Sequence, residues 1–320
     1  MAVSAGKSIQ RIDLPTRREF FERWLPLGQP LVIAGAFPNW RAMREWSIPW
    51  FKENHGETMI WVESGDLFSF RREHIALAEF ITRAIEADPP ERLYWSGARL
   101  LNTIPGLADY FDLDRPDLFS QALMSPPMIY VGPDGAFSPI HYDDALNFSA
   151  QVVGTKRWVF YAPDQTDLLY RYPWHHVLGH FSEINTVQKL ADYRTFPLFE
   201  RAESWEAIVE PGDLIHVPRG WWHHVISQGP TISLHFFWKR WPQYLQQLIR
   251  RPLWRALGKR PQSDVWLDWR KTRPIRRLRA MLGHDDSRQI RELNEIRDRA
   301  RGIITGKDDR AVEARGGDSP

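Results

Sequence analysis

Apolar and polar residues alternate with the two-residue period of β-strands over most of the segment from Met128 to Trp238. Runs rich in Val, Ile, Phe and Trp are separated there by glycine, proline and aspartate, which favour turns. The pattern predicts strands at 128–132, 138–142, 146–153, 156–161, 205–209, 213–217, 222–227 and 231–238. Short strands with turns between them are typical of a double-sheet jelly roll.

Helical periods are found before this region. Thr16 and Glu19 have the spacing of a capping box, which predicts a helix that runs to about Leu25. Residues 73–86 place apolar side chains on one side at helical spacing, and we expect a second helix there. Two further strands are predicted, at 30–34 and 92–95. Four tryptophans of this part are expected in the core: Trp40, Trp46, Trp50 and Trp61.

Two segments interrupt the predicted strands. Residues 163–170 read as a short helix that begins at Pro163. Residues 171–200 form a long excursion with three histidines, His175, His176 and His180. We interpret it as an ordered substrate loop; the alternative is a second metal site, but no carboxylate has a ligand-like spacing among these histidines.

After Trp241 the pattern is helical again, and Ile290, Leu293 and Ile296 recur at helical spacing. An apolar stripe beyond the predicted strands either covers them or meets the same helix of a second subunit, and we expect a homodimer. The sequence thus divides into four regions. They are an N-terminal α/β segment (1–125) that packs on the jelly roll, the core (126–240), a helical region (241–304) and a disordered tail (305–320).

Composition narrows the classes of function. The chain has no cysteine, which excludes a disulfide framework, cysteine-ligated zinc and a cysteine nucleophile. It has no run of about 18 apolar residues and starts without the apolar core of a signal peptide, so we expect a cytoplasmic protein.

The formal net charge of +2 is unevenly distributed. Residues 240–320 hold 20 Lys and Arg against 11 Asp and Glu, a net of +9, which leaves 42 − 20 = 22 basic and 40 − 11 = 29 acidic residues, or −7, for the rest. Such asymmetry is compatible with a nucleic-acid partner. Interspersed charges of this kind more often solvate helices, which is the interpretation that we favour.

Candidate metal ligands lie on two of the predicted strands. His141 and Asp143 are two residues apart, so an extended strand directs both side chains to one face. His223 follows a second turn-rich motif with Gly212, Pro218 and Gly220. Two imidazoles and one carboxylate form a facial triad with open coordination positions, the ligand set of non-haem Fe(II) oxygenases.

At these residues the sequence resembles the cupin-like JmjC family of Fe(II)- and 2-oxoglutarate-dependent oxygenases, and within it the asparaginyl hydroxylases. The resemblance covers about residues 30–240. The shared residues are Arg92–Tyr94, His141–Asp143, Asn147–Phe148, Ala150–Gln151, Gly154, Lys156–Arg157, Pro163–Gln165, Tyr172–Pro173, His175–His176, Pro211–Asp213 and Trp221–His224. The fold it implies is mainly β, a double-stranded β-helix with N-terminal α/β elements and a C-terminal helical extension.

The resemblance also implies roles for single residues. His141, Asp143 and His223 would hold Fe(II), whereas His224 would point away from the metal. Lys156 would pair with the distal carboxylate of 2-oxoglutarate, because a desolvated dianion needs a fixed cation. The remaining implied co-substrate contacts are the hydroxyls of Tyr94 and Ser138, and Asn147 near the metal-bound end. His235 replaces an asparagine of the asparaginyl hydroxylases. It would either contact the co-substrate or an iron-bound water, or be a hydrogen-bonded core histidine, and both interpretations remain open.

The implied activity is oxidation of a C–H bond by O2, coupled to conversion of 2-oxoglutarate into succinate and CO2. The substrate is a protein or peptide side chain or a small molecule. An N-methyl demethylase and an RNA or tRNA hydroxylase are alternatives within the family. A metal-binding cupin of other activity and a binding module are alternatives of another class. Ser96, His180 and Phe181 differ from the substrate-facing residues of asparaginyl hydroxylases, so asparagine is not assumed as the target.

Overall fold

The computed structural model describes residues 6–64, 71–111, 123–124, 127–172, 179–184 and 195–239. They all belong to the first of two compact units, Met1–Ser263; the second is Asp264–Pro320. The predicted helices and dimer stripe of 241–304, the tail 305–320, and both His175 and His176 lie outside the described residues. Within the described ranges no helix is both long and apolar enough to cross a membrane.

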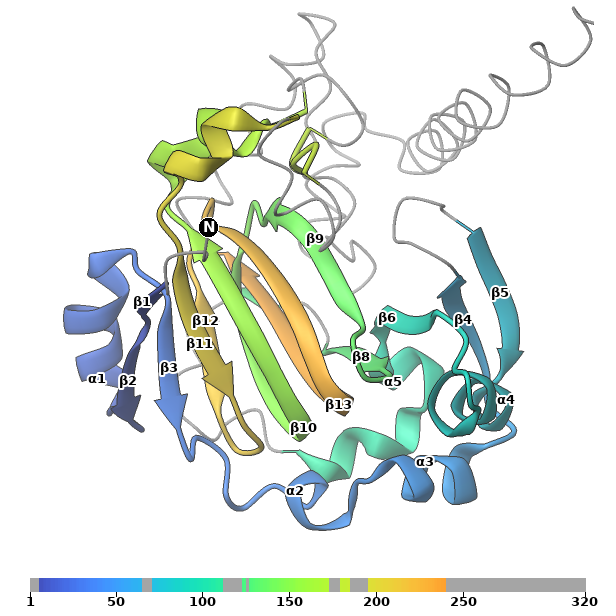
Figure 1. Cartoon of the computed structure of the whole chain (residues 1–320). Coiled ribbons are helices and arrows are strands. Elements are labelled where there is room, and N and C mark those ends of the chain that lie inside the picture. The colour runs from blue at the N-terminus through green and yellow to red at the C-terminus, as the bar shows by residue number, and fades with distance from the viewer. Residues whose placement is uncertain are drawn as a thin grey trace, which may run out of the picture. The chain divides into compact units, whose positions relative to one another are not determined.

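Strands dominate the described part of the chain (Figure 1). In chain order they are β1 Lys7–Ser8, β2 Gln10–Asp13, β3 Leu31–Ala34, β4 Met59–Ser64, β5 Arg71–Ala76, β6 Leu93–Arg99, β7 Leu123–Met124, β8 Met128–Gly132, β9 Phe137–Tyr142, β10 Leu146–Tyr161, β11 Trp205–Val209, β12 Leu214–Val217 and β13 Trp222–Lys239. Their main order in the sheet is β2-β3-β12-β10-β13-β8-β6-β4-β5, with β9 paired to β13 and β11 to β10. The mainly β fold that the sequence predicts is confirmed.

Short helices come from the first half of the chain and from two later connections. The α-helices are α1 Arg17–Glu19, α2 Ala42–Glu45, α3 Ile48–His55, α4 Leu77–Ile81 and α5 Leu100–Thr103. Phe20–Trp24 and Thr82–Glu86 are π-helical, and Leu25–Leu27, Pro105–Tyr110, Pro163–Leu169 and Pro197–Arg201 form 3-10 turns. The predicted capping box is present, because the Thr16 side chain accepts from the Glu19 backbone and the Glu19 carboxylate accepts from the Thr16 backbone.

The two central strands, β10 and β13, separate an apolar layer from a polar interior. Phe148 and Phe236 are paired across these strands and pack with Phe20 and Trp40, which come from the N-terminal segment. The alternate positions of the same strands carry buried polar side chains, namely Asn147, Ser149, Gln151, Ser233 and His235. Alternation places these polar residues on the face opposite the apolar core, where they line the interior of the jelly roll.

Three predictions about elements need correction. The strands predicted at 146–153 and 156–161 are one strand, β10, and those at 222–227 and 231–238 are one strand, β13, because β-bulges let the chain bend without ending the pairing. Residues 73–76 belong to β5 rather than to a helix, since β5 pairs with β4 and the helical turns begin only at Leu77. Trp61 is 58% exposed, whereas Trp40 and Trp46 are buried.

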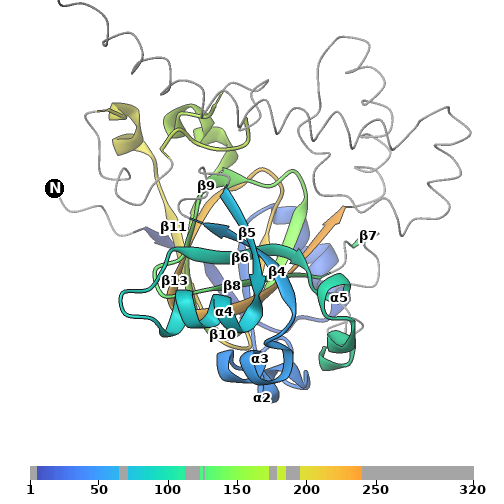
Figure 2. The same ribbon diagram turned by 90° about the vertical axis from the view of Figure 1, so that its right-hand side faces the viewer.

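Figure 2 views the molecule from the side of β4, β5 and β6, with α3 and α4 near them. Leu93 and Trp95 of β6 face the core, whereas Tyr94 and Ser96 face the other side. β6 in turn pairs with β8, which pairs with β13. The sheet of β4, β5 and β6 therefore extends the strands around the polar interior, and Tyr94 lies on the side that faces this interior.

Candidate metal and co-substrate site

His141, Asp143 and His223 converge in the structure. Their ligand atoms all lie within 4.8 Å of one another, and the Nε2 atom of His223 is 3.8 Å from Oδ2 of Asp143. His141 and His223 are directly paired across β9 and β13, and their ring centroids are 4.3 Å apart. Asp143 follows the end of β9, where its carbonyl accepts from the Gly220 backbone. This donor set suits a divalent metal ion with open coordination positions.

Backbone carbonyls orient both imidazoles. The Nδ1 atom of His141 lies 2.8 Å from the Pro139 carbonyl, and Nδ1 of His223 lies 3.1 Å from the Trp221 carbonyl. A carbonyl only accepts, so each Nδ1 carries the hydrogen and each Nε2 keeps its lone pair. This arrangement, in which the second ring nitrogen is tied to a carbonyl, is common for metal-ligating histidines.

The neighbouring histidine, His224, is not part of this cluster. It is buried, and its Nδ1 is 2.8 Å from the Ser138 carbonyl. Burial lowers the pKa of His224 to about 4, so the ring is neutral at physiological pH. This placement agrees with the expectation from the resemblance that His224 points away from the metal.

A β-bulge brings Ser138 to the same face as the candidate metal ligands. His223 is paired with His141, and Val225 is paired with Ser138. Two residue steps along β13 therefore correspond to three steps along β9. In a regular strand Ser138 and His141, three residues apart, would point to opposite faces. The Ser138 hydroxyl accepts from the Val225 backbone at 3.1 Å, which leaves its own hydrogen for another acceptor.

Lys156 is a buried cation without a carboxylate partner among the described residues. Its side chain shares a face of β10 with Trp158, and Trp158 stacks on His223 at 5.7 Å between ring centroids. Its Nζ donates to the Ser233 hydroxyl at 2.7 Å and lies 5.9 Å from the ring centre of Tyr130. Burial lowers the pKa of Lys156 to about 7. A carboxylate of 2-oxoglutarate fits here, because it would supply the missing counter-charge.

His235 has polar neighbours on both sides of its ring. Nε2 lies 3.0 Å from the Ser149 hydroxyl and 3.3 Å from that of Ser233, and Nδ1 lies 3.3 Å from the Asn147 amide nitrogen. Burial, and then the charge of Lys156, lower the pKa of His235 well below its ordinary value. The structure therefore shows a hydrogen-bonded core histidine that is linked through Ser233 to the buried lysine.

Two tyrosines complete the polar interior. Tyr94 and Tyr130 have ring centroids 6.3 Å apart, and Tyr130 packs at 4.1 Å on His235. Burial, and then the charge of Glu63, raise the pKa of Tyr94; burial, and then the charge of Asp143, raise that of Tyr130. Both phenols stay protonated at neutral pH and are available as hydroxyl donors. Asn147 is buried close by, and its amide oxygen has no partner among the described residues.

A short segment after the 3-10 turn approaches the candidate metal ligands. The Tyr142 backbone donates to the His180 carbonyl, and the Ser182 backbone donates to the Ile140 carbonyl. The Phe181 ring stacks on His141. The described part of the predicted substrate loop therefore lies against β9, with Phe181 beside a candidate ligand and His180 next to it.

Beyond Tyr94, the outer side of β4 and β6 forms a groove of about 360 Å³. Trp61 and Met59, 58% and 49% exposed, lie along it. The Glu63 carboxylate accepts from Arg72 at 3.0 Å and from the Ser96 hydroxyl at 2.8 Å. Because Glu63 is paired with Tyr94 across the sheet, the groove adjoins the polar interior.

Tyr130, Ser149 and Ser233 are site residues that were not predicted from the sequence. A signal for Ser233 is present in the segment Thr231-Ile232-Ser233-Leu234-His235-Phe236, where every second residue is polar. An apolar strand with one polar face predicts a polar interior. The partner of each hydroxyl depends on register, which this segment does not define alone.

Comparison with known proteins places this geometry in a family. The family model described as "Cupin-like domain" matches residues 17–244. The chain is 27% identical over 250 residues to "Jumonji C domain-containing protein 5" of Drosophila melanogaster, covering 74% of this chain and 61% of that protein. It is 27% identical over 238 residues to "Lysine-specific demethylase 8" of Xenopus tropicalis, covering 72% of this chain and 53% of that protein.

A third relative is "tRNA wybutosine-synthesizing protein 5" of Gallus gallus, 26% identical over 257 residues, which cover 73% of this chain and 78% of that protein. The chain thus spans between half and two thirds of the first two relatives and more of the third. The family match includes the predicted metal ligands, Lys156 and the strands that position them. The protein belongs to the cupin-like JmjC-domain family.

Proposed function

We propose that this protein is an Fe(II)- and 2-oxoglutarate-dependent oxygenase that hydroxylates a C–H bond of its substrate. The observation that carries the proposal is a buried lysine, Lys156, which has no carboxylate partner among the described residues and lies in the interior that also holds the cluster His141, Asp143 and His223. The lysine supports a carboxylate ligand, and the three side chains support a metal ion with open positions. Bound iron supplies oxidation of a substrate C–H bond by O2, coupled to decarboxylation of 2-oxoglutarate.

The protein's own residues bind and orient. His141 and His223 would present Nε2 to the metal because their Nδ1 hydrogens are held by carbonyls. Lys156 would bind the distal carboxylate of 2-oxoglutarate, with the hydroxyls of Tyr94 and Ser138 as further donors. The aromatic rings of Trp158 and Phe181 line the site and exclude water from it, which strengthens these polar contacts.

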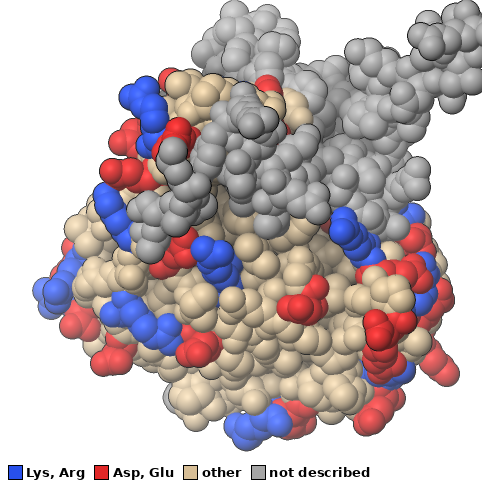
Figure 3. Space-filling model, viewed as in Figure 1, with Lys and Arg blue, Asp and Glu red and all other residues tan. Residues whose placement is uncertain are grey.

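The substrate class is a finer proposal. We favour a protein or peptide, because Trp, Met and Arg are enriched at protein interfaces and the groove beside Tyr94 has Trp61, Met59 and Arg72. Binding of RNA requires cations for its phosphates, whereas Arg72 is paired with Glu63. Figure 3 shows basic and acidic side chains interspersed over the described residues of the visible face.

Demethylation is the alternative that the name of one relative favours, since that protein is "Lysine-specific demethylase 8". The first step is the same oxidation, on an N-methyl carbon, and the product then loses formaldehyde. Hydroxylation of another carbon leaves a stable hydroxyl group. Measurement of formaldehyde and of a 16 Da mass increase on a candidate peptide separates the two reactions.

Metal binding tests the proposal first. Asp143→Ala removes a charged ligand and should lower the affinity for Mn(II), a redox-silent substitute for Fe(II), by about tenfold or more in calorimetric titration. Asp144→Ala is the matched control, because Asp144 pairs with Arg219 at the surface instead. Equal Mn(II) affinity of wild type and Asp143→Ala would exclude the triad.

Co-substrate turnover is the second test. The wild-type protein with Fe(II) and O2 should convert 2-oxoglutarate into succinate, and Lys156→Ala should weaken 2-oxoglutarate binding by about a hundredfold or more, since an unpaired buried charge costs about 3–5 kcal/mol. A metal-binding cupin of another activity would bind Mn(II) and form no succinate.

The predicted homodimer remains a proposal, because Leu293 lies outside the described residues; light scattering at micromolar concentration tests it.

A further inference from the structure

A hydrogen-bonded chain leads from Lys156 across the interior to His235. Nζ of Lys156 donates to Oγ of Ser233 at 2.7 Å, and this Oγ lies 3.3 Å from Nε2 of His235. All three side chains are buried, with exposures of 2%, 0% and 7%. Water does not reach the three side chains of this hydrogen-bonded series, so each must find its hydrogen-bond partners within the protein.

The direction of each hydrogen bond follows from the number of hydrogens. A serine hydroxyl has one hydrogen, and an ammonium only donates. When Lys156 is charged, Ser233 accepts from it and directs its own hydrogen to Nε2 of His235, which must then be an acceptor. The Nδ1 hydrogen of His235 needs an acceptor too. Exchange of the oxygen and nitrogen positions of the Asn147 amide, which lies 3.3 Å away, would supply one.

We propose that Ser233 and His235 are positioning residues that orient Lys156 and favour its charged form only in part, and that binding of 2-oxoglutarate is accompanied by uptake of a proton at Lys156. The inference rests on the proposed function. His235 does not need to touch the co-substrate, because it acts through the Ser233 hydroxyl. A buried ammonium that has a hydroxyl as its partner is poorly stabilised until a carboxylate arrives.

The sign of the proton linkage follows from this geometry. Burial lowers the pKa of Lys156 to about 7, so above pH 7 the neutral amine dominates in the empty site. A bound carboxylate favours the ammonium, and the complex then takes a proton from solvent. Affinity for 2-oxoglutarate should therefore fall by up to about tenfold for each pH unit above 7.

Among the residues that the structure describes, the other titratable groups around Lys156 do not change their protonation state between pH 7 and 9. They are His235 on β13, Tyr130 on β8 and, farther along the interior, Tyr94 on β6 and His223. Burial lowers the pKa of the imidazoles and raises the pKa of the phenols, so each stays neutral in this range. On β11, the residue paired with Lys156 is the uncharged Val209.

The test is calorimetric titration of 2-oxoglutarate into the full chain saturated with Mn(II), at pH 7, 8 and 9. Each pH is measured in two buffers with different ionisation enthalpies, which gives the number of protons taken up. We expect about half a proton at pH 7, about 0.9 at pH 8, and a tenfold loss of affinity from pH 8 to 9. Lys156→Arg should bind with no such pH dependence, since a guanidinium stays charged throughout.

Variants test the two positioning residues. Ser233→Ala and His235→Leu should weaken 2-oxoglutarate binding several-fold at pH 7 and raise proton uptake there towards one, because the ammonium loses its acceptor chain. His235→Gln should restore the wild-type profile, since its amide oxygen lies near the position of Nε2 and can still accept from Ser233. Mn(II) affinity, measured in every variant, verifies that the site is folded.

The outcomes separate the inference from the proposed function. Absence of 2-oxoglutarate binding by the wild type at every pH overturns both. Binding without proton uptake and with constant affinity overturns the inference and keeps the oxygenase. A His235→Leu variant with weaker binding but the wild-type pH profile shows that His235 has a packing role alone, and overturns its assignment as a positioning residue.

Discussion

The ring of Phe181 lies nearly parallel to the imidazole of His141, with centroids 5.4 Å apart and an angle of 23° between the planes. The same two residues form an antiparallel β-bridge. His141 is therefore restrained twice, at Nδ1 by the Pro139 carbonyl and on its face by Phe181. Residues that orient a metal ligand in this way affect metal affinity although they do not touch the metal.

Phe181→Ala should accordingly lower Mn(II) affinity by about tenfold, the lower end of the range for residues that support metal ligands. Phe196→Ala is the matched control, because Phe196 packs on Tyr170 in a separate apolar cluster. Calorimetric titration of both variants with Mn(II) measures the effect. Equal loss of affinity in both would indicate general destabilisation rather than orientation of His141.

Acid should destabilise the fold through His216. This side chain is 1% exposed among Phe20, Phe148 and Trp238, and the backbone of Asn147 only partly offsets the effect of its burial. Burial lowers its pKa to about 3, so between pH 6.5 and 3 the unfolded state binds a proton that the folded state does not. The free energy of unfolding should therefore fall as pH falls, by up to about 1.4 kcal/mol per pH unit from this group.

Urea denaturation of His216→Leu between pH 6 and pH 4 measures this contribution. Its free energy of unfolding should depend less steeply on pH than that of the wild type. His74→Leu, at an exposed position, is the matched control. A slope for His216→Leu equal to that of the wild type would show that His216 does not contribute to acid sensitivity.

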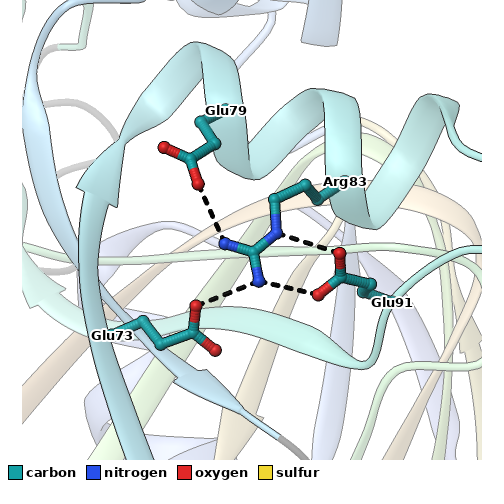
Figure 4. Close-up of polar contacts among 4 residues, drawn as sticks. All are labelled: Glu73, Glu79, Arg83 and Glu91. Carbon is teal, nitrogen blue, oxygen red and sulfur yellow. Dashed lines mark hydrogen bonds and ion pairs between the residues drawn. The ribbon is translucent and has the colours of Figure 1, made fainter.

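Arg83 connects three separate segments through carboxylates (Figure 4). Its guanidinium is 3.0 Å from Glu73 of β5, 3.0 Å from Glu79 of α4, and bound through two nitrogens to Glu91 at 2.7 and 3.0 Å. Arg83→Met keeps the apolar stem and leaves three carboxylates close together. The midpoint of thermal unfolding should fall by about 2–4 °C, which corresponds to about 1 kcal/mol at this size.

Salt separates this charge effect from packing. The difference in unfolding midpoint between Arg83→Met and the wild type should become smaller in 1 M NaCl, because salt screens the repulsion among the carboxylates. Arg44→Met, at an exposed position of α2, provides the control. If Arg83→Met unfolds at the wild-type temperature at low salt, the cluster makes no contribution to stability.

Two tryptophans should lose very different amounts of unfolding free energy on truncation. Trp40 is 2% exposed and stacks on Phe37 at 4.4 Å, so Trp40→Ala should cost about 3–5 kcal/mol of unfolding free energy. Trp61→Ala should cost about 0.5 kcal/mol, because its side chain is 58% exposed in the groove. Chemical denaturation measures both values; a large loss for Trp61→Ala would mean that Trp61 serves packing.

The mainly β fold could be predicted because alternation repeats over the segment from 128 to 238. The convergence of His141 and Asp143 follows from their two-residue spacing, and the structure brings them to His223. The burial of Lys156 could be inferred only with the resemblance, since a lone lysine on a strand is usually solvated. For the strands and for His141 and Asp143, local spacing in the sequence carries most of the information.

What could not be predicted depends on pairing between distant segments. The pattern of 73–86 fits a helix, but pairing with β4 draws residues 71–76 into β5, because tertiary context overrides local preference. Trp61 is apolar in an apolar stretch, and its exposure follows from the face of β4 that the register selects. The contacts of Ser233 with Lys156 and His235 depend on register in the same way.

The bulge between Ser138 and His141 limits how this strand can change in evolution. Regular pairing with β13 at the present three-residue spacing would turn Ser138 away from the interior while His141 kept its place. Deletion of Pro139 or Ile140 would instead remove the bulge and shorten the spacing to two residues, which keeps the Ser138 hydroxyl on the face of His141. The bulge and the spacing are therefore linked, and an ungapped alignment with a relative that lacks the bulge would align Ser138 with a residue that faces the opposite side of the sheet.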